Sequence, residues 1–123
     1  MGLRNGSKPI TVFEFLTGAF YFYASSKSKS DVVISENGLF KRYDSVDSIG
    51  NHLMNITCSI SEDHLDWLPE GKKNINQIIT EKTSNINSAY IVVAKQSDKK
   101  ILQKIKKSIE KNPAKKIFYS TNQ

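Results

Sequence analysis

The chain has 123 residues, of which 38% are hydrophobic and 24% charged, and its formal net charge is +6. This length and composition are typical of one globular domain and exclude an intrinsically disordered chain. The single cysteine, Cys58, excludes a fold held by intramolecular disulfides and favours a reducing, cytoplasmic location. We therefore expect a single domain over residues 1–123, with a flexible N-terminus at 1–9 and a C-terminal tail at 121–123.

The positive charge is unevenly distributed along the chain. Residues 31–94 hold five basic and nine acidic residues, whereas residues 95–123 hold nine lysines and two acidic residues. Such an asymmetry bears on the choice of partner and not on the fold. It predicts a basic C-terminal unit beside an acidic middle segment.

Residues 11–25, TVFEFLTGAFYFYAS, contain six aromatic residues around one glycine. Glu14 lies inside the apolar run, which argues against a secretory signal, and the run is too short for a membrane span. A hairpin that turns at Thr17-Gly18 is favoured, because it sorts the phenylalanines onto one face and the tyrosines onto the other. A helix is the alternative, because Thr11 and Glu14 form a capping box.

Residues 31–44, DVVISENGLFKRYD, are predicted to form a second hairpin. Asn37-Gly38 is a strong two-residue turn signal between two apolar runs. Lys41 and Glu36 intrude at the edges of the apolar face. Two consecutive hairpins predict an antiparallel meander at the N-terminus.

The middle of the chain is predicted to be helical. Ser45 is a plausible N-cap for a first helix. The apolar stripe of that helix is Val46, Ile49, Leu53 and Ile56. A short helical turn is expected within residues 61–71, and residues 73–82, KNINQIITEK, place three isoleucines on one helical face.

The last third of the chain predicts a strand, a helix and a strand. Residues 88–95, SAYIVVAK, form a continuous β-branched run that indicates a strand buried on both faces. An amphipathic helix follows, for which we expect Ser97 as the N-cap and Asp98 in the first turn, and residues 115–120, KKIFYS, form another strand. This order predicts a parallel βαβ unit. The fold class is therefore α+β (mixed α/β), with N-terminal antiparallel β-hairpins, middle helices and a C-terminal parallel βαβ unit on one mixed sheet.

The C-terminal helix and its flanks carry the leading candidate surface. Clustered lysines are a footprint for phosphate groups, although a solvated surface helix has the same pattern. The cluster lacks arginine, which argues against bidentate reading of bases. We predict a small non-enzymatic binding protein whose basic helix engages an acidic partner, most simply the nucleic-acid backbone. The lysines are Lys95, Lys99, Lys100, Lys104, Lys106, Lys107, Lys111, Lys115 and Lys116.

A second hypothesis, from a different class, is a protein-binding inhibitor or immunity-type protein. Its contact surface would combine the acidic segment 44–70 with aromatic side chains, which supply large contact areas at low entropic cost. Solvated helix caps are the plainer interpretation of the same acids. The candidate residues are Asp44, Asp47, Glu62, Asp63, Asp66, Trp67, Glu70, Tyr21 and Tyr23.

A third hypothesis is a metal-independent ribonuclease in which His52 and His64 serve as acid and base. This chemistry requires that the fold bring the two rings together. The spacing of these histidines relative to Cys58 and Asp66 matches no zinc pattern, so no metal is predicted. The sequence holds no phosphate-cradling glycine loop and no dinucleotide fingerprint, so no cofactor is predicted. We expect no membrane partner.

Overall fold

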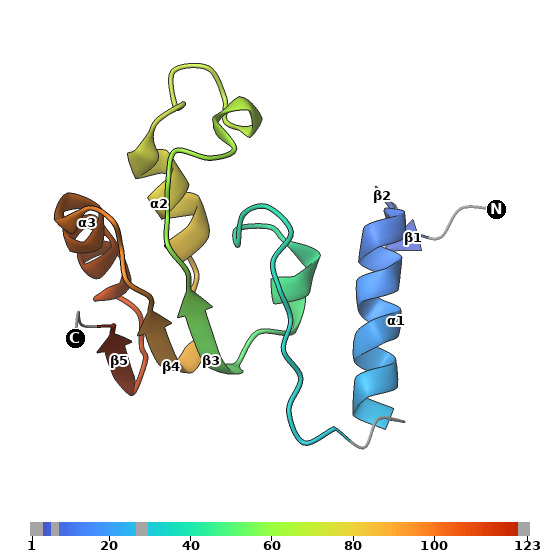
Figure 1. Cartoon of the computed structure of the whole chain (residues 1–123). Coiled ribbons are helices and arrows are strands. Elements are labelled where there is room, and N and C mark those ends of the chain that lie inside the picture. The colour runs from blue at the N-terminus through green and yellow to red at the C-terminus, as the bar shows by residue number, and fades with distance from the viewer. Residues whose placement is uncertain (1–3, 6–7, 27–29, 121–123) are drawn as a thin grey trace.

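The structure is a computed structural model that describes residues 4–5, 8–26 and 30–120 (Figure 1). The predicted tail at 121–123, and residues 1–3 and 6–7 of the predicted flexible N-terminus, lie outside the described residues. In chain order the elements are β1 (Arg4–Asn5), β2 (Lys8–Pro9), α1 (Val12–Ser26), the 3-10 helix η1 (Ser45–Ile49), β3 (His52–Thr57), the 3-10 helix η2 (Leu65–Trp67), α2 (Ile75–Thr83), β4 (Ser88–Val93), α3 (Lys99–Ile109) and β5 (Lys116–Tyr119).

The main sheet is parallel and runs in the order β3–β4–β5. Ile91 of the central strand β4 lies beside Asn55 of β3 and Ile117 of β5. The C-terminal strand–helix–strand unit is therefore parallel, as that part of the sequence predicted. The two-residue strands β1 and β2 form a separate antiparallel pair ahead of α1.

Helices α2 and α3 lie side by side and cover one face of this sheet. Both begin at a side-chain cap. Asn74 accepts a hydrogen bond from the Gln77 N–H (3.1 Å), and Asp98, not the predicted Ser97, accepts one from the Lys100 N–H (2.7 Å). The buried core that they form with the sheet is Ile60, Leu68, Ile78, Ile79, Ile86, Ile91, Val93, Ile105 and Ile109. The predicted burial of β4 on both faces was wrong, because its other face is only half-buried at Tyr90 and Val92.

Helix α1 replaces the hairpin predicted for residues 11–25, so that prediction was wrong. The Thr11 N–H donates to Glu14 Oε2 (2.7 Å), and the Glu14 N–H donates to Thr11 Oγ1 (3.2 Å). This capping box satisfies donors that a helix start leaves unpaired, whereas Thr17-Gly18 is a weak turn pair. The hydrogen bond from the Thr11 backbone lowers the pKa of the Glu14 carboxyl below its usual value.

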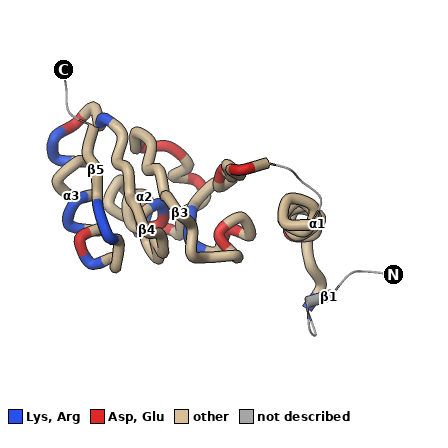
Figure 2. The backbone as a smooth tube through the Cα atoms, turned by 90° about the horizontal axis from the view of Figure 1, so that it is seen from below, with Lys and Arg blue, Asp and Glu red and all other residues tan. Residues whose placement is uncertain are grey.

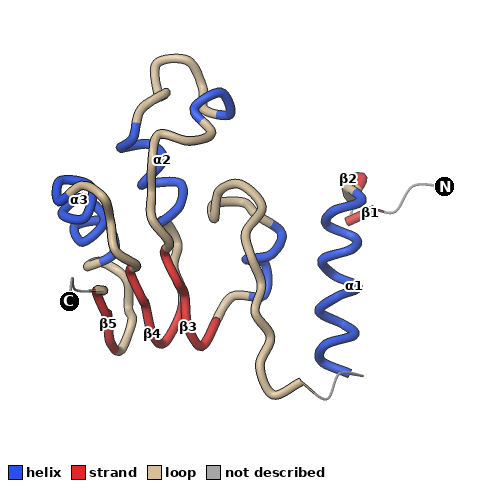
Figure 3. Tube along the Cα trace, in the orientation of Figure 1, coloured by secondary structure: helices blue, strands red, loops and turns tan. Residues whose placement is uncertain are grey.

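The second predicted hairpin is also absent from the described chain. Residues 31–44 contain no strand and run as loop and turns (Figure 3). The Gly38 N–H donates to the carboxylate of Asp44 (2.8 Å), so the turn at Asn37-Gly38 closes on a side chain and not on a strand partner. The predicted antiparallel meander and the mixed sheet were therefore wrong, and the main sheet is purely parallel.

Residues 45–56 form one short helix and one strand, where the sequence predicted a single amphipathic helix. Asp44, and not Ser45, caps η1 by accepting a hydrogen bond from the Val46 N–H (2.9 Å). Gly50 (φ 62°) and Asn51 (φ 50°) then adopt positive φ, which ends the helix. The predicted turn in 61–71 and helix at 73–82 are confirmed as η2 and α2.

Helix α1 stands apart from the sheet, with η1 lying between them (Figures 1 and 2). Thr17 Oγ1 lies 3.2 Å from Ser45 Oγ, and the Tyr21 hydroxyl donates to the Val46 carbonyl (2.6 Å). These contacts hold one side of α1 against η1. None of the helices within the described residues combines the length and the apolar character that a membrane span requires.

Candidate functional site

The predicted lysines lie on α3, at the start of β5 and in the loops that flank α3, at the end of the molecule opposite α1 (Figure 2). Burial of Ile105 and Ile109 turns the remaining sides of α3 toward solvent. Lys106 is half-buried, and its ammonium lies 4.5 Å from the centre of the Tyr119 ring. The others are exposed and form what we call the lysine surface: Lys95, Lys99, Lys100, Lys104, Lys107, Lys111, Lys115 and Lys116.

The charge of the lysine surface is not neutralised by ion pairs within the described residues. The basic residues in the carboxylate pairs found there are Lys41, Arg42, His52, His64 and Lys73. Next to this surface, burial and the negative charge of Glu110 raise the pKa of the Tyr119 hydroxyl. Tyr119 therefore stays neutral near neutral pH and adds no negative charge beside the lysines.

The predicted acidic residues divide into structural and exposed groups. Asp44 caps η1, Asp47 pairs with buried Lys41, and Asp63 binds the backbone N–H of His64 (2.8 Å). Glu70 forms an ion pair with Lys73. Glu62, Asp66 and Trp67 are exposed before α2, with Trp67 72% exposed. These three exposed residues remain available for the predicted protein contact, and that contact stays a prediction.

The two tyrosines do not form the predicted pair on a strand face. Positions two apart on a helix point about 200° apart, so Tyr21 and Tyr23 face different sides of α1. Tyr21 is held by η1, and its hydroxyl oxygen also lies 3.2 Å from Ser35 Oγ. Tyr23 is exposed. Only one of the two is therefore presented to solvent.

The two histidines belong to separate clusters. His52 begins β3, and its Nε2 lies 3.2 Å from Asp47 Oδ1. His64 follows the carboxyl end of β3, where its Nε2 lies 3.2 Å from Asp63 Oδ2 and its ring meets Phe40 edge-on. His52 lies at the start of β3 and His64 follows its other end, and a six-residue strand spans roughly 20 Å. The structure thus gives each histidine its own carboxylate and does not join them.

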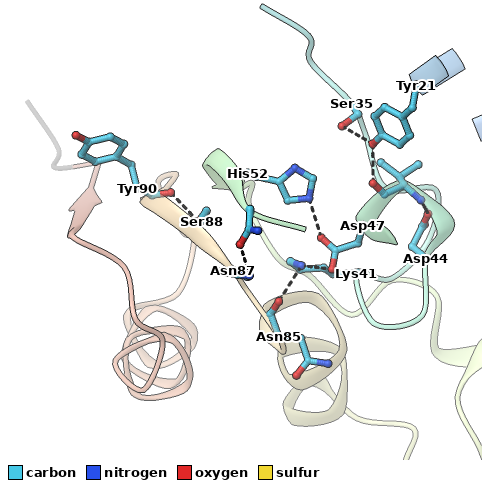
Figure 4. Close-up of polar contacts among 12 residues, drawn as sticks. Tyr21, Ser35, Lys41, Asp44, Asp47, His52, Asn85, Asn87, Ser88 and Tyr90 are labelled. Carbon is cyan, nitrogen blue, oxygen red and sulfur yellow. Dashed lines mark hydrogen bonds and ion pairs between the residues drawn. The ribbon is translucent and has the colours of Figure 1, made fainter. Parts of the chain in front are cut away.

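Figure 4 shows the most buried charged group of the described chain, which we call the Lys41 cluster: Lys41, Asp47, His52 and Asn85. The Lys41 side chain is only 4% exposed; it pairs with Asp47 Oδ2 and donates to the Asn85 carbonyl (3.2 Å). Asp47 stands between this ammonium and the imidazole of His52. The cluster joins the loop before η1 to the start of β3 and to the turn after α2.

The sequence offered one weak signal for this cluster. Lys41 interrupts the apolar face expected for residues 31–44, and a lysine on an apolar face is buried only when it is paired. Its partners are distant in sequence, with Asn85 lying 44 positions away. The carboxylate of Asp47 fixes the orientation of the His52 ring, which is an arrangement that general acid–base sites share with structural ion-pair networks.

A cleft of about 500 Å³ separates α1 from residues 38–45, and a second of similar size continues along η1. The carboxylates of Glu14, Asp44 and Asp47 line these clefts. Each carboxylate already has a partner within the chain. Glu14 accepts from Thr11, Asp44 accepts from Gly38, and Asp47 pairs with Lys41. Within the described residues, no group of three or more His, Cys, Asp or Glu side chains is placed to hold a metal ion.

The chain is similar to the dihydrofolate synthase/folylpolyglutamate synthase of Bacillus subtilis (strain 168), with 31% identity over 104 residues. The aligned region covers 85% of this chain and 23% of that protein, so the chain spans about a quarter of the length of the relative. No protein-family model matches the chain, and no solved structure matches it. The similarity thus extends over most of this chain and over a minor part of a longer enzyme.

Proposed function

We propose that this chain acts as one part of a synthase of the dihydrofolate synthase/folylpolyglutamate synthase type. The observation that carries the proposal is the 31% identity to such an enzyme over 104 residues. The parallel α/β unit adds support by analogy alone, because open parallel sheets commonly carry enzyme sites. Since the chain spans 23% of the relative, the proposal assigns it a share of the activity and not the whole reaction.

The carboxyl edge of the sheet is where we propose that the chain contributes to the site. Ligands of open α/β sheets bind outside the carboxyl ends of the strands. Gln96, which follows β4, fixes the loop after β3 at this edge. Its Oε1 accepts from the Ile60 N–H (2.9 Å), and its Nε2 donates to the Cys58 carbonyl (3.2 Å). Gln96 is therefore a positioning residue for the loop that would border the ligand.

A chimera tests this function. The matched segment of the B. subtilis synthase is replaced by this chain, and formation of folylpolyglutamate is measured. We expect product above that of a synthase lacking the segment. Gln96→Ala should lower the rate at least about tenfold, because two bonds that position the loop after β3 are lost.

Gln103→Ala on the exposed side of α3 is the matched control, and it should leave the rate of the chimera unchanged. Circular dichroism and thermal unfolding establish that each chimera is folded. A folded chimera that makes no product would contradict the proposed function. Equal rates for the two glutamine variants would contradict the role given to Gln96.

We propose electrostatic binding of a polyanion, most simply a nucleic-acid backbone, as a second candidate function. The observation in its favour is the lysine surface, where eight exposed lysines lie outside the ion pairs of the described residues. Backbone binding of this kind releases counterions and weakens steeply with salt. The lack of arginine on this surface favours binding that is independent of sequence.

Charge reversal tests the second candidate by fluorescence polarisation with labelled RNA and DNA across a salt series. Lys104→Glu/Lys107→Glu should weaken binding at least about tenfold and flatten the salt dependence. Lys8→Glu/Lys72→Glu reverses two exposed lysines elsewhere and makes the same change in net charge. Equal losses in the two double variants would mean that net charge, and not the lysine surface, governs the interaction. No binding at low salt would reject this candidate.

We also propose that the protein is located in the cytoplasm. Cys58 is a free thiol and is exposed. An exposed free thiol persists more readily in a reducing compartment than in an oxidising one. Fractionation of cells that express the intact protein would test this location.

A further inference from the structure

One face of the main sheet lacks a covering helix in the described part of the chain. In the register of the strands, Met54, Tyr90 and Lys116 lie on this face, and so do Ile56, Val92 and Phe118. Ile56 is 60% exposed and Phe118 40% exposed, whereas Ile91 and Val93 on the opposite face are fully buried. We call this the uncovered sheet face: Met54, Ile56, Tyr90, Val92 and Phe118.

The composition of this face does not suit permanent contact with water. A sheet that has one solvated face alternates apolar and polar side chains, but in the central strand β4 both faces are largely apolar, and Met54 and Ile56 of β3 extend the uncovered one. Tyr90 and Phe118 pack at 6.4 Å between ring centres, and the Lys116 ammonium lies over the Phe118 ring. Purely parallel sheets occur almost only with both faces covered. The face therefore has the character of an interface.

Helix α1 does not provide that cover. It is tied to η1 through Thr17 and Tyr21, and η1 lies between α1 and the sheet (Figures 1 and 2). Among the elements of the described chain, α1 packs mainly against η1. Covering the sheet with α1 would require these contacts to break.

We infer that the uncovered sheet face docks a helix from the part of a synthase that lies outside the matched region. The inference rests on the proposed function. The matched region is 23% of the B. subtilis relative, so more than three quarters of such an enzyme is available to supply the covering element. The five residues of the face are uncharged, so the complementary surface is the apolar stripe of an amphipathic helix. Lys116 at the rim favours an acidic residue beside that stripe.

The test compares thermal unfolding of the isolated chain with that of the chimera described above. Ile56→Glu places a carboxylate on the face, and Ile49→Glu makes the same change on η1, where Ile49 is 56% exposed. In the isolated chain each variant should shift Tm by no more than about 2 °C, as surface substitutions do. In the chimera, Ile56→Glu should lower Tm by at least about 6 °C, because an unpaired charge becomes buried, and Ile49→Glu should not.

Two results would overturn the inference. One is an Ile56→Glu chimera as stable as its parent, even if that chimera makes folylpolyglutamate. The other is an equally large loss in the isolated chain, which would mean that α1 or a second copy already covers the face. A folded but inactive chimera that is selectively destabilised by Ile56→Glu would support the docking surface and count against the proposed function.

A measurement with separate chains covers the case in which the chimera does not fold. The full chain is mixed with the B. subtilis synthase that lacks the matched segment, and the mass of the complex is measured by light scattering. A one-to-one complex that is lost with Ile56→Glu and kept with Ile49→Glu supports the inference. No complex, or a complex indifferent to both variants, overturns it.

Discussion

Replacing Ile91 with alanine is expected to lower the free energy of unfolding by about 2–5 kcal/mol. Ile91 is fully buried in the central strand β4, where it belongs to the core between the sheet and helices α2 and α3. Truncation removes apolar contacts and leaves a cavity that a rigid sheet cannot close. Urea unfolding followed by circular dichroism measures the loss.

Ile56→Ala is the matched control, because it makes the same truncation on the neighbouring strand β3. Ile56 is 60% exposed in the isolated chain, so the change should cost less than about 0.5 kcal/mol. The two variants together compare how much a buried and an exposed isoleucine, on opposite faces of the sheet, contribute to the free energy of unfolding. Equal losses at the two positions would contradict a core restricted to the face that α2 and α3 cover.

Replacing Asp47 with alanine is expected to cost about 3 kcal/mol, nearly as much as a core truncation. The Lys41 side chain is 4% exposed, and without Asp47 its ammonium keeps only the Asn85 carbonyl as a partner within the described residues. Removing one partner of a buried ion pair leaves an unpaired charge, and this is more destabilising than replacing both partners with apolar side chains. His52 loses its carboxylate partner in the same variant. Urea unfolding again gives the free-energy change.

The Lys41→Met/Asp47→Ala double variant separates the charge effect from general damage to the loop. It should be more stable than Asp47→Ala alone, because methionine fills the site without a charge. Asp66→Ala removes an exposed carboxylate and should change stability by less than about 0.5 kcal/mol. A double variant less stable than Asp47→Ala would show that Lys41 contributes by packing and not through the ion pair.

The C-terminal half of the fold could be predicted because its signals are local. Asn74 and Asp98 cap α2 and α3, and the isoleucines that follow repeat with the helical period. The lysine surface follows from the same period, since burial of one stripe of α3 exposes the others. These features depend on residues three or four positions apart.

The N-terminal third illustrates a competition between two local signals. The arrangement of aromatic residues in 11–25 favoured a two-sided hairpin, whereas Thr11 and Glu14 favoured the start of a helix. The capping box of Thr11 and Glu14 decided for the helix, because it satisfies backbone donors that a turn at Thr17-Gly18 would not. The prediction that Tyr21 and Tyr23 share one face was wrong for the same reason, since the two side chains face different sides of the helix α1.

The sequence by itself determined α2, α3, β4, β5 and the exposed lysines of α3, because hydrogen bonds and side-chain periodicity within a few residues specify them. Only the tertiary structure decided that 52–57 is a strand, that Lys41 is buried, and that one face of the sheet is left uncovered. The physical reason is the distance along the chain between the groups that meet. His52 lies beside Ser88, and Lys41 donates to Asn85, which is 44 positions away. Patterns that repeat every two to four residues cannot predict contacts between residues so far apart in the sequence.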